Sequence, residues 1–331
     1  MRRLLALALL AAAARSDEPP KLTLCLAPAA DDSPVYPLKE VPATNREIVI
    51  VFRLRAEESF ETLTDVWVAV DTGDAAPANT EMGRGDFKLR AVKHGYFRYT
   101  LPKDIPIGKY RLDALGDGKP WASLEFTVVE AARPERLERP ADLLPLEPGT
   151  TWSSSWLLEP GAIAKNVTVA GVEKGEDGRF RSATTFTVAG KEGDVAHIEM
   201  RRGETLASEE WWSLTAKGLH VTQQKVNDQT RPYDPPLPMI AFPLRSPHKW
   251  TYRPKDKSPQ IEYRMWGALP VKTPSAEMPG WIVLMRTVSG REISTIERHY
   301  AKGVGVVREV HVDAVGPELL MRVEAELLPA K

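Results

Sequence analysis

The feature that most constrains the fold is a run of alternating apolar residues on both sides of a short glycine-containing turn, within 293–312. A period of two places successive side chains on opposite faces of an extended chain, which is the pattern of a half-buried β-strand. The alternating residues are Ile296, Arg298 and Tyr300 before the turn, and Val306, Arg308, Val310 and Val312 after it. The turn, 301–305, contains Gly303 and Gly305, which tolerate the positive φ of a hairpin reversal. The stretch therefore predicts a β-hairpin in which at least one of these glycines has a positive φ.

Length and composition extend this prediction to the whole chain. The chain has 331 residues, enough for two domains, and its 28 prolines outnumber its 22 glycines. Long helical periodicities are missing, which favours strands joined by proline-containing loops. The formal net charge of −1 provides no basic surface, so no nucleic-acid partner is expected. A mainly β fold class follows.

The N-terminus has the features of an export signal. Arg2 and Arg3 provide the positive region, 4–14 is an apolar run, and 12–14 is an A-x-A cleavage sequence. We therefore predict that 1–16 is a signal peptide; the alternative is an uncleaved N-terminal anchor. No later segment is apolar and long enough to span a bilayer, so the mature chain is expected to carry no transmembrane span. It should be exported, either to the periplasm or into the medium.

Strand signals occur in two blocks. Between 22 and 130, about seven short strands follow one another without a helical pattern, which is typical of an immunoglobulin-like β-sandwich. Residues 131–142 are charged, contain two prolines and lack alternation, so they are predicted to be a linker; the alternative is a short helix that caps one domain. Strand signals resume over 143–331, which is predicted to be a second, larger β domain.

The second block contains a short repeat. The sequence P-L-x5-W occurs at 145–152 and again at 243–250, each time at the start of a predicted strand. This recurrence suggests an internal duplication, in which Trp152 and Trp250 each anchor the first strand of a half-sheet. The stretch 281–285, WIVLM, is apolar on both faces and is predicted to be a central strand that is covered on both sides.

The end of the first block resembles the last hairpin of bacterial immunoglobulin-like accessory domains. The residues concerned are 107–114 (IGKYRLDA), Gly118 and 124–128 (LEFTV). The resemblance implies an immunoglobulin-like fold for 22–130, although the paired cysteines and core tryptophan of antibody domains are absent from the pattern.

A second resemblance lies in the hairpin stretch. Residues 297–308, ERHYAKGVGVVR, resemble a W/Y-Y-A-x-G-V-G-x-V-K signature of exported bacterial proteins with lipoprotein-carrier-like curved sheets (LolA/LppX-type, TapB-like). Those proteins usually carry an upstream P-L-x-x-G-x-x-W strand, which 145–152 matches, whereas His299 and Lys302 depart from the signature. The resemblance covers 143–328 and implies a curved, half-barrel-like antiparallel sheet. Because such sheets host several functions, it implies the fold more than the function.

Motifs for catalysis and metal binding are missing from the sequence. It contains no G-x-S-x-G, H-E-x-x-H or P-loop sequence, and the serines at 153–155 lack a recognisable base. His197, His299 and His311 fall in separate predicted strands, which a fold could bring together. The single cysteine, Cys25, excludes an internal disulfide. The chain is therefore expected not to be an enzyme and to hold no cofactor and no metal.

The second block is also rich in tryptophan. If its sheet is hollow, an apolar ligand is expected on one face; the alternative is that the tryptophans fill a closed core. The predicted lining residues are Trp266, Trp281, Val283 and Met285, with Met239 and Phe242 from the proline-rich segment 232–243 over the mouth. The residues predicted to be structural are Trp152, Trp250, Tyr300, Gly303 and Gly305.

Together these features predict an exported, non-catalytic binding or envelope-associated protein. Its expected partner is an unknown apolar ligand or an envelope protein. The alternative is an accessory module of an extracellular enzyme system, or a structural scaffold that binds a protein or carbohydrate partner. A hollow second domain favours the carrier, and a filled one favours the scaffold.

Overall fold

The computed structural model describes residues 21–329, except 90–91, 132–139, 163, 165–166, 170–171, 245, 257 and 317. The predicted signal peptide and most of the predicted linker lie outside the described residues. Within the described part the chain forms 21 β-strands and two short 3-10 helices, so the mainly β fold class is confirmed. None of the helices in this part is long and apolar enough to cross a membrane.

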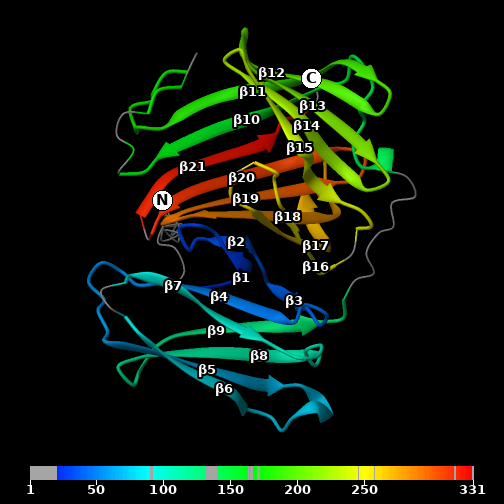
Figure 1. The fold of residues 1–331 in the computed structure, drawn as a ribbon. Coiled ribbons are helices and arrows are strands. Elements are labelled where there is room, and N and C mark those ends of the chain that lie inside the picture. The colour runs from blue at the N-terminus through cyan, green and yellow to red at the C-terminus, as the bar shows by residue number, and fades with distance from the viewer. Residues whose placement is uncertain are drawn as a thin grey trace, which may run out of the picture.

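The N-terminal region is a β-sandwich of two sheets (Figure 1). The first sheet is antiparallel, in the order β2 (Pro34–Pro37), β1 (Leu22–Pro28), β4 (Glu47–Arg53), β7 (His94–Thr100). The second has the order β3 (Glu40–Pro42), β9 (Lys119–Val129), β8 (Gly108–Gly116), β5 (Thr62–Asp71), β6 (Thr80–Lys88), with only β3 and β9 parallel and with η1 (Gly73–Ala75) after β5. Alternating side chains of both sheets, such as Ile50, Trp67, Phe97 and Leu112, form the core between them.

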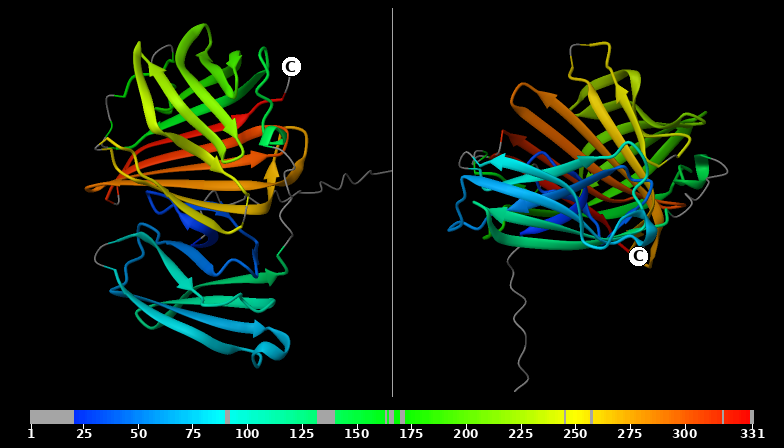
Figure 2. Two further views of the ribbon diagram at one scale, coloured as in Figure 1. Left: turned by 45° about the vertical axis from the view of Figure 1, so that its right-hand side comes forward. Right: turned by 90° about the horizontal axis from the view of Figure 1, so that it is seen from below.

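The C-terminal region is one curved antiparallel sheet, as the resemblance implied, and this sheet has twelve strands (Figures 1 and 2). It follows η2 (Pro140–Asp142) and consists of two six-stranded meanders. The first meander is β10 (Thr151–Pro160), β11 (Phe180–Glu192), β12 (Val195–Arg202), β13 (Thr205–Thr215), β14 (Gly218–Val226) and β15 (Gln229–Ala241). The second is β16 (His248–Tyr252), β17 (Ile261–Lys272), β18 (Glu277–Ser289), β19 (Glu292–Ala301), β20 (Gly305–Val315) and β21 (Glu318–Leu327). Pairing of β10 with β21 joins the two meanders into one sheet.

The two meanders repeat the same row of side chains. In each, the tryptophan of the P-L-x5-W sequence lies on the first strand and stacks on an aromatic ring directly opposite it on the second strand. The ring centroids are 5.4 Å apart in the first meander and 4.9 Å apart in the second. The third strand adds a methionine to each row. The two rows are Trp152–Phe186–Met200 and Trp250–Tyr263–Met285, and they support the proposed duplication.

The predicted hairpin is formed by β19 and β20. Gly303 has a φ of 73° and Gly305 a φ of 86°, so the expected positive φ is confirmed at both positions. The turn is tied to the segment that enters the sheet, because the amide of Gly303 donates to the carbonyl oxygen of Asp142 at 2.7 Å. A Cβ atom on Gly305 would collide with the side chain of Leu144.

The sandwich packs against the curved sheet through the β1–β2 hairpin, which lies beneath β18–β20 in Figure 1. The contact combines an apolar cluster with polar contacts. The backbone amide of Ala30 donates to Thr295 Oγ1 at 3.0 Å, and Glu47 binds both Lys249 and Arg264. The apolar contacts come from Leu26, Ala27 and Val35 on one side and from Trp266, Ile282 and Leu284 on the other. The two regions therefore share a hydrophobic cluster.

Candidate functional site

The twelve-stranded sheet has an inner face, around which it curves, and an outer face, which the sandwich partly covers. Trp281, Val283 and Met285 of β18 belong to the inner core. The residues between them, Ile282 and Leu284, face outward into the cluster shared with the β1–β2 hairpin. The prediction that 281–285 is covered on both sides is therefore confirmed.

Five of the six predicted lining residues lie together in the inner core. They are Trp281, Val283, Met285 and Met239, which are buried, and Phe242, which is partly buried. Trp281 is 1% exposed and Val283 is 0% exposed, so neighbouring side chains already cover them. Trp152, Trp250 and Tyr300, predicted to be structural, pack in this same core. This end of the inner face is filled by the protein's own side chains.

Trp266 lies on the opposite side of the sheet from the other five residues. It pairs with Ile282, and both belong to the cluster with Leu26 and Val35 of the sandwich. A bulge after Gly267 interrupts the alternation of β17, so the spacing of the tryptophans along the chain did not indicate their faces. Trp266 therefore helps to hold the two regions together and does not contact the inner face.

Burial of the inner face decreases along β12, β13 and β19, whereas Leu158 and Phe180, at the same end of β10 and β11, are buried. On β19, Tyr300 is fully buried, whereas Arg298, Ile296 and Ser294 are half-buried. The same change occurs on β13, from buried Trp212 to half-buried residues nearer its start. We call the half-buried part the open end. Its inner-face residues are Ser294, Ile296, Arg298, Glu309, His311, Asp313, Met200, Arg202, Ser208, Glu210 and Trp156.

The open end contains a charged cluster. Arg298 Nε lies 2.6 Å from Glu309 Oε2 on the neighbouring strand. Glu210 on β13 accepts hydrogen bonds from Trp212 Nε1 at 2.7 Å and from Gln224 Nε2 at 2.9 Å. Glu210 and Arg298 occupy equivalent positions in the two meanders. In each meander the fourth strand pairs with the methionine of the row, through Ser208 in the first and Ile296 in the second, and the charged residue follows two positions later on that strand.

Burial and neighbouring charges shift the pKa values of this cluster. Burial raises the pKa of Glu210, and the Trp212 hydrogen bond and the Arg298 charge only partly oppose that rise. Burial by itself would lower the pKa of Arg298, but the adjacent Glu309 carboxylate and the Tyr300 oxygen raise it above its ordinary value. Arg298 is therefore permanently charged, and its hydrogen bonds are held in a region with little water.

The sequence contains one signal for this cluster, which was not among the predicted site residues. Arg298 alternates with Ile296 and Tyr300, which places an arginine on an otherwise apolar strand face. Charged residues are seldom buried unless they are paired, so its position indicates a partner. Glu210 had no comparable local signal, because its approach to Arg298 depends on the curvature of the sheet.

The three histidines considered together in the sequence do not converge. His197 lies 2.9 Å from Glu209, and His299 lies 2.5 Å from Glu297 on the outer face. His311 lies on the inner face, 2.9 Å from Asp313. In the described ranges, no group of three or more His, Cys, Asp or Glu side chains is placed to hold a metal ion.

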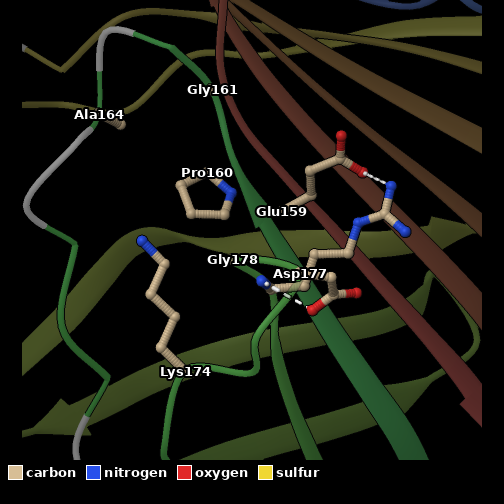
Figure 3. Close-up of a pocket in the computed structure, with 8 residues that line it drawn as sticks. Glu159, Pro160, Gly161, Ala164, Lys174, Asp177 and Gly178 are labelled. Atoms are coloured by element: carbon tan, nitrogen blue, oxygen red, sulfur yellow. Dashed lines mark hydrogen bonds and ion pairs between the residues drawn. The ribbon is translucent and has the colours of Figure 1, made fainter.

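A separate pocket lies on the surface near the start of β11 (Figure 3). Its volume is about 610 Å³, and it is lined by Glu159, Pro160, Gly161, Ala164, Lys174, Asp177, Gly178 and Arg179. Its acids are paired, because Arg179 lies 3.0 Å from Glu159 and Arg181 lies 2.6 Å from Asp177. The Arg181 hydrogen bond holds the pKa of Asp177 well below its usual range. Lys174 extends toward Pro160 in Figure 3.

No protein-family model matches the chain, and no curated protein matches it either. The β-sandwich and the curved antiparallel sheet are therefore established by the strand pairing of this chain alone. Membership of the immunoglobulin-like or lipoprotein-carrier-like families is not established by any match.

Proposed function

We propose that the protein is an exported, non-catalytic binding protein that holds an apolar or amphipathic ligand at the open end of the inner face. Export rests on the signal-like sequence at 1–16. The binding role extends the resemblance of 143–328 to lipoprotein-carrier-like sheets. The position of the ligand differs from the one expected from sequence, because the tryptophan-rich end is filled.

The observation that carries this proposal is the decrease in burial along the inner face of β12, β13 and β19. Tyr300 and Trp281 are covered, whereas Ile296, Met200 and Trp156 are half-buried on the same face. A folded chain gains free energy by covering apolar side chains, so a half-covered apolar strip inside a curved sheet suits a ligand.

The energetics permit such a ligand. Burying an acyl chain contributes about 0.8 kcal/mol for each methylene. Six to eight buried methylenes would thus contribute about 5–6 kcal/mol, which offsets part of the entropic cost of association. The Arg298–Glu309 pair and Glu210 provide hydrogen-bonding groups for a polar part of the same ligand.

A bulky side chain at the open end tests the proposal. Ala325 is half-buried and faces inward between Trp156 and Glu309, so Ala325→Trp should occupy the space of a ligand. We expect the mature protein to bind the neutral apolar dye N-phenylnaphthylamine at micromolar concentration, measured by fluorescence, and Ala325→Trp to weaken binding at least tenfold. Ser155→Trp is the control, because Ser155 is exposed and faces outward on the strand next to β21.

Equal binding by wild type and Ala325→Trp would place the dye elsewhere and contradict the proposal. Failure of the wild type to bind the dye, together with no apolar molecule in an organic extract of protein from its native envelope, would also contradict it.

A protein-binding scaffold is the second candidate function. It is favoured by β6, which forms a free edge of the five-stranded sheet and exposes Met82 and Phe87. Exposed sheet edges can pair with an extended segment of another protein. Under this candidate the inner face is a closed structural core, and the protein binds no apolar dye.

A further inference from the structure

Three polar side chains form a continuous row on the inner face of the first meander. Ser154 of β10 is directly opposite Thr184 of β11, and Thr184 is directly opposite Arg202 of β12. Directly opposite residues share a face of the sheet, so the three side chains are neighbours. Trp156 lies beside them, with the Arg202 guanidinium 4.5 Å from the centre of its ring.

Each of these three side chains has a buried polar atom without a hydrogen-bond partner among the described residues. The atoms are Ser154 Oγ, Thr184 Oγ1 and Arg202 Nε. Ser154 is 8% exposed and Thr184 is 3% exposed. Buried polar atoms in native proteins are normally hydrogen-bonded, so a group of three adjacent unsatisfied atoms indicates a missing partner.

Arg202 also lacks a counter-charge. It makes no ion pair with any described residue, whereas Arg201 beside it on the outer face lies 3.0 Å from Glu199. Burial lowers the pKa of Arg202, and no neighbouring acid opposes that effect. A half-buried guanidinium without a carboxylate lowers stability, so its presence at this position calls for an anion from outside the chain.

The second meander shows that this row is not required by the fold. The equivalent positions, two residues beyond the stacked aromatic row, are Tyr252, Ile261 and Thr287. There the Tyr252 hydroxyl donates to the carbonyl oxygen of Pro235 at 2.8 Å, and Ile261 is apolar. The second meander therefore forms the same part of the sheet with no charged side chain at these three positions. The row with a buried arginine is specific to the first meander.

We propose that Ser154, Thr184 and Arg202 bind the carboxylate of a monocarboxylic acid whose apolar chain lies along the open end of the inner face. The two hydroxyls and the guanidinium supply at least three donors, and a carboxylate offers about four acceptor sites. A single guanidinium neutralises one negative charge, which fits a carboxylate better than a phosphate dianion. The inference rests on the proposed function and names the class of its ligand.

The experiment compares three ligands with one tail and different heads: decanoate, decanol and decyl phosphate. Binding to the mature protein is measured by calorimetry and by the fluorescence of the tryptophans, below the critical micelle concentration. We expect decanoate to bind roughly 10- to 100-fold more tightly than decanol, as a hydrogen bond to a charged group predicts. Arg202→Met should remove this difference between decanoate and decanol.

Stability distinguishes a lost site from a damaged fold. Arg202→Met and Thr184→Val remove unsatisfied polar groups, so their urea midpoints should equal or exceed that of the wild type while decanoate binding weakens. Arg201→Met, on the outer face, is the matched control and should bind decanoate as the wild type does.

The outcomes separate the two proposals. Binding of decanol as tight as that of decanoate, or unchanged decanoate binding by Arg202→Met, would overturn the carboxylate site and leave the apolar binding role intact. Tighter binding of decyl phosphate would replace the carboxylate by a phosphate. Absence of binding by all three ligands would contradict the carboxylate site and the proposed function together.

Discussion

Single side chains determine how much charge each core contains. Arg298 is retained on the inner face with Glu309 2.6 Å away, because a buried charge is tolerated when it is paired. Asp65 in the sandwich makes no ion pair with any described residue, and the charged group that influences its pKa is Asp86. Burial, with a smaller contribution from Asp86, raises the pKa of Asp65 to about 6.

The raised pKa of Asp65 predicts a pH-dependent stability. In the unfolded chain the carboxyl loses its proton near pH 4, whereas in the folded chain it keeps the proton up to about pH 6. Stability therefore falls as pH rises between these values, by roughly 2–3 kcal/mol in total. We expect Asp65→Asn to be nearly neutral at pH 4 and to raise the free energy of unfolding at pH 7.5. Urea unfolding at both pH values measures this, and an equal effect at both would contradict it.

The turn of the β19–β20 hairpin is held by a segment outside the hairpin. The turn contains two glycines with positive φ, but their surroundings differ. Gly303 has open space where a Cβ atom would lie, whereas Gly305 lies against the buried side chain of Leu144. The segment before β10 thus packs directly onto the turn and couples the entry of the sheet to β19 and β20.

This difference predicts unequal effects of the same substitution. Gly303→Ala should lower the free energy of unfolding by about 1 kcal/mol, because it introduces only backbone strain. Gly305→Ala should lower it by roughly 2–4 kcal/mol, because the new methyl group also displaces Leu144. Denaturant unfolding of both variants measures the difference. Equal midpoints would show that Leu144 does not restrict this position.

At the scale of the whole molecule, the sandwich is joined to the twelve-stranded sheet at the outer face of that sheet. Val35 of the sandwich is 1% exposed because it packs into the cluster that contains Trp266, Ile282 and Leu284. Separation of the two regions would expose this cluster to water. The sandwich therefore has a structural role toward the sheet, in addition to any function of its own.

The shared cluster predicts cooperative unfolding of the two regions. We expect a single transition in urea when tryptophan fluorescence and far-ultraviolet circular dichroism are followed together. Val35→Asp buries a charge in the cluster and should split the curve into two transitions or increase the radius of gyration in small-angle scattering. Leu206→Asp is the control, because Leu206 is exposed. Two transitions in the wild type would contradict the prediction.

Local pattern alone was sufficient for several features of this protein. Alternation in 293–312 predicted the hairpin, the glycines predicted its positive φ, and the recurring P-L-x5-W sequence predicted a half-sheet that starts twice. These features depend on the period of the strand and on backbone sterics, which act between residues close in sequence. The apolar stretch 281–285 likewise indicated a strand covered on both sides.

Only the tertiary structure decided which residues meet. Trp266 and Trp281 were expected on one face, but a bulge in β17 and the pairing register place them on opposite faces. The sequence indicated that 281–285 is covered twice, but not that the second cover is the β1–β2 hairpin. Glu210 approaches Arg298 because the sheet curves. Ser154, Thr184 and Arg202 lie in one row because β10, β11 and β12 pair in one register. Strand register and curvature are set by packing among residues far apart in the chain, and no local pattern records them.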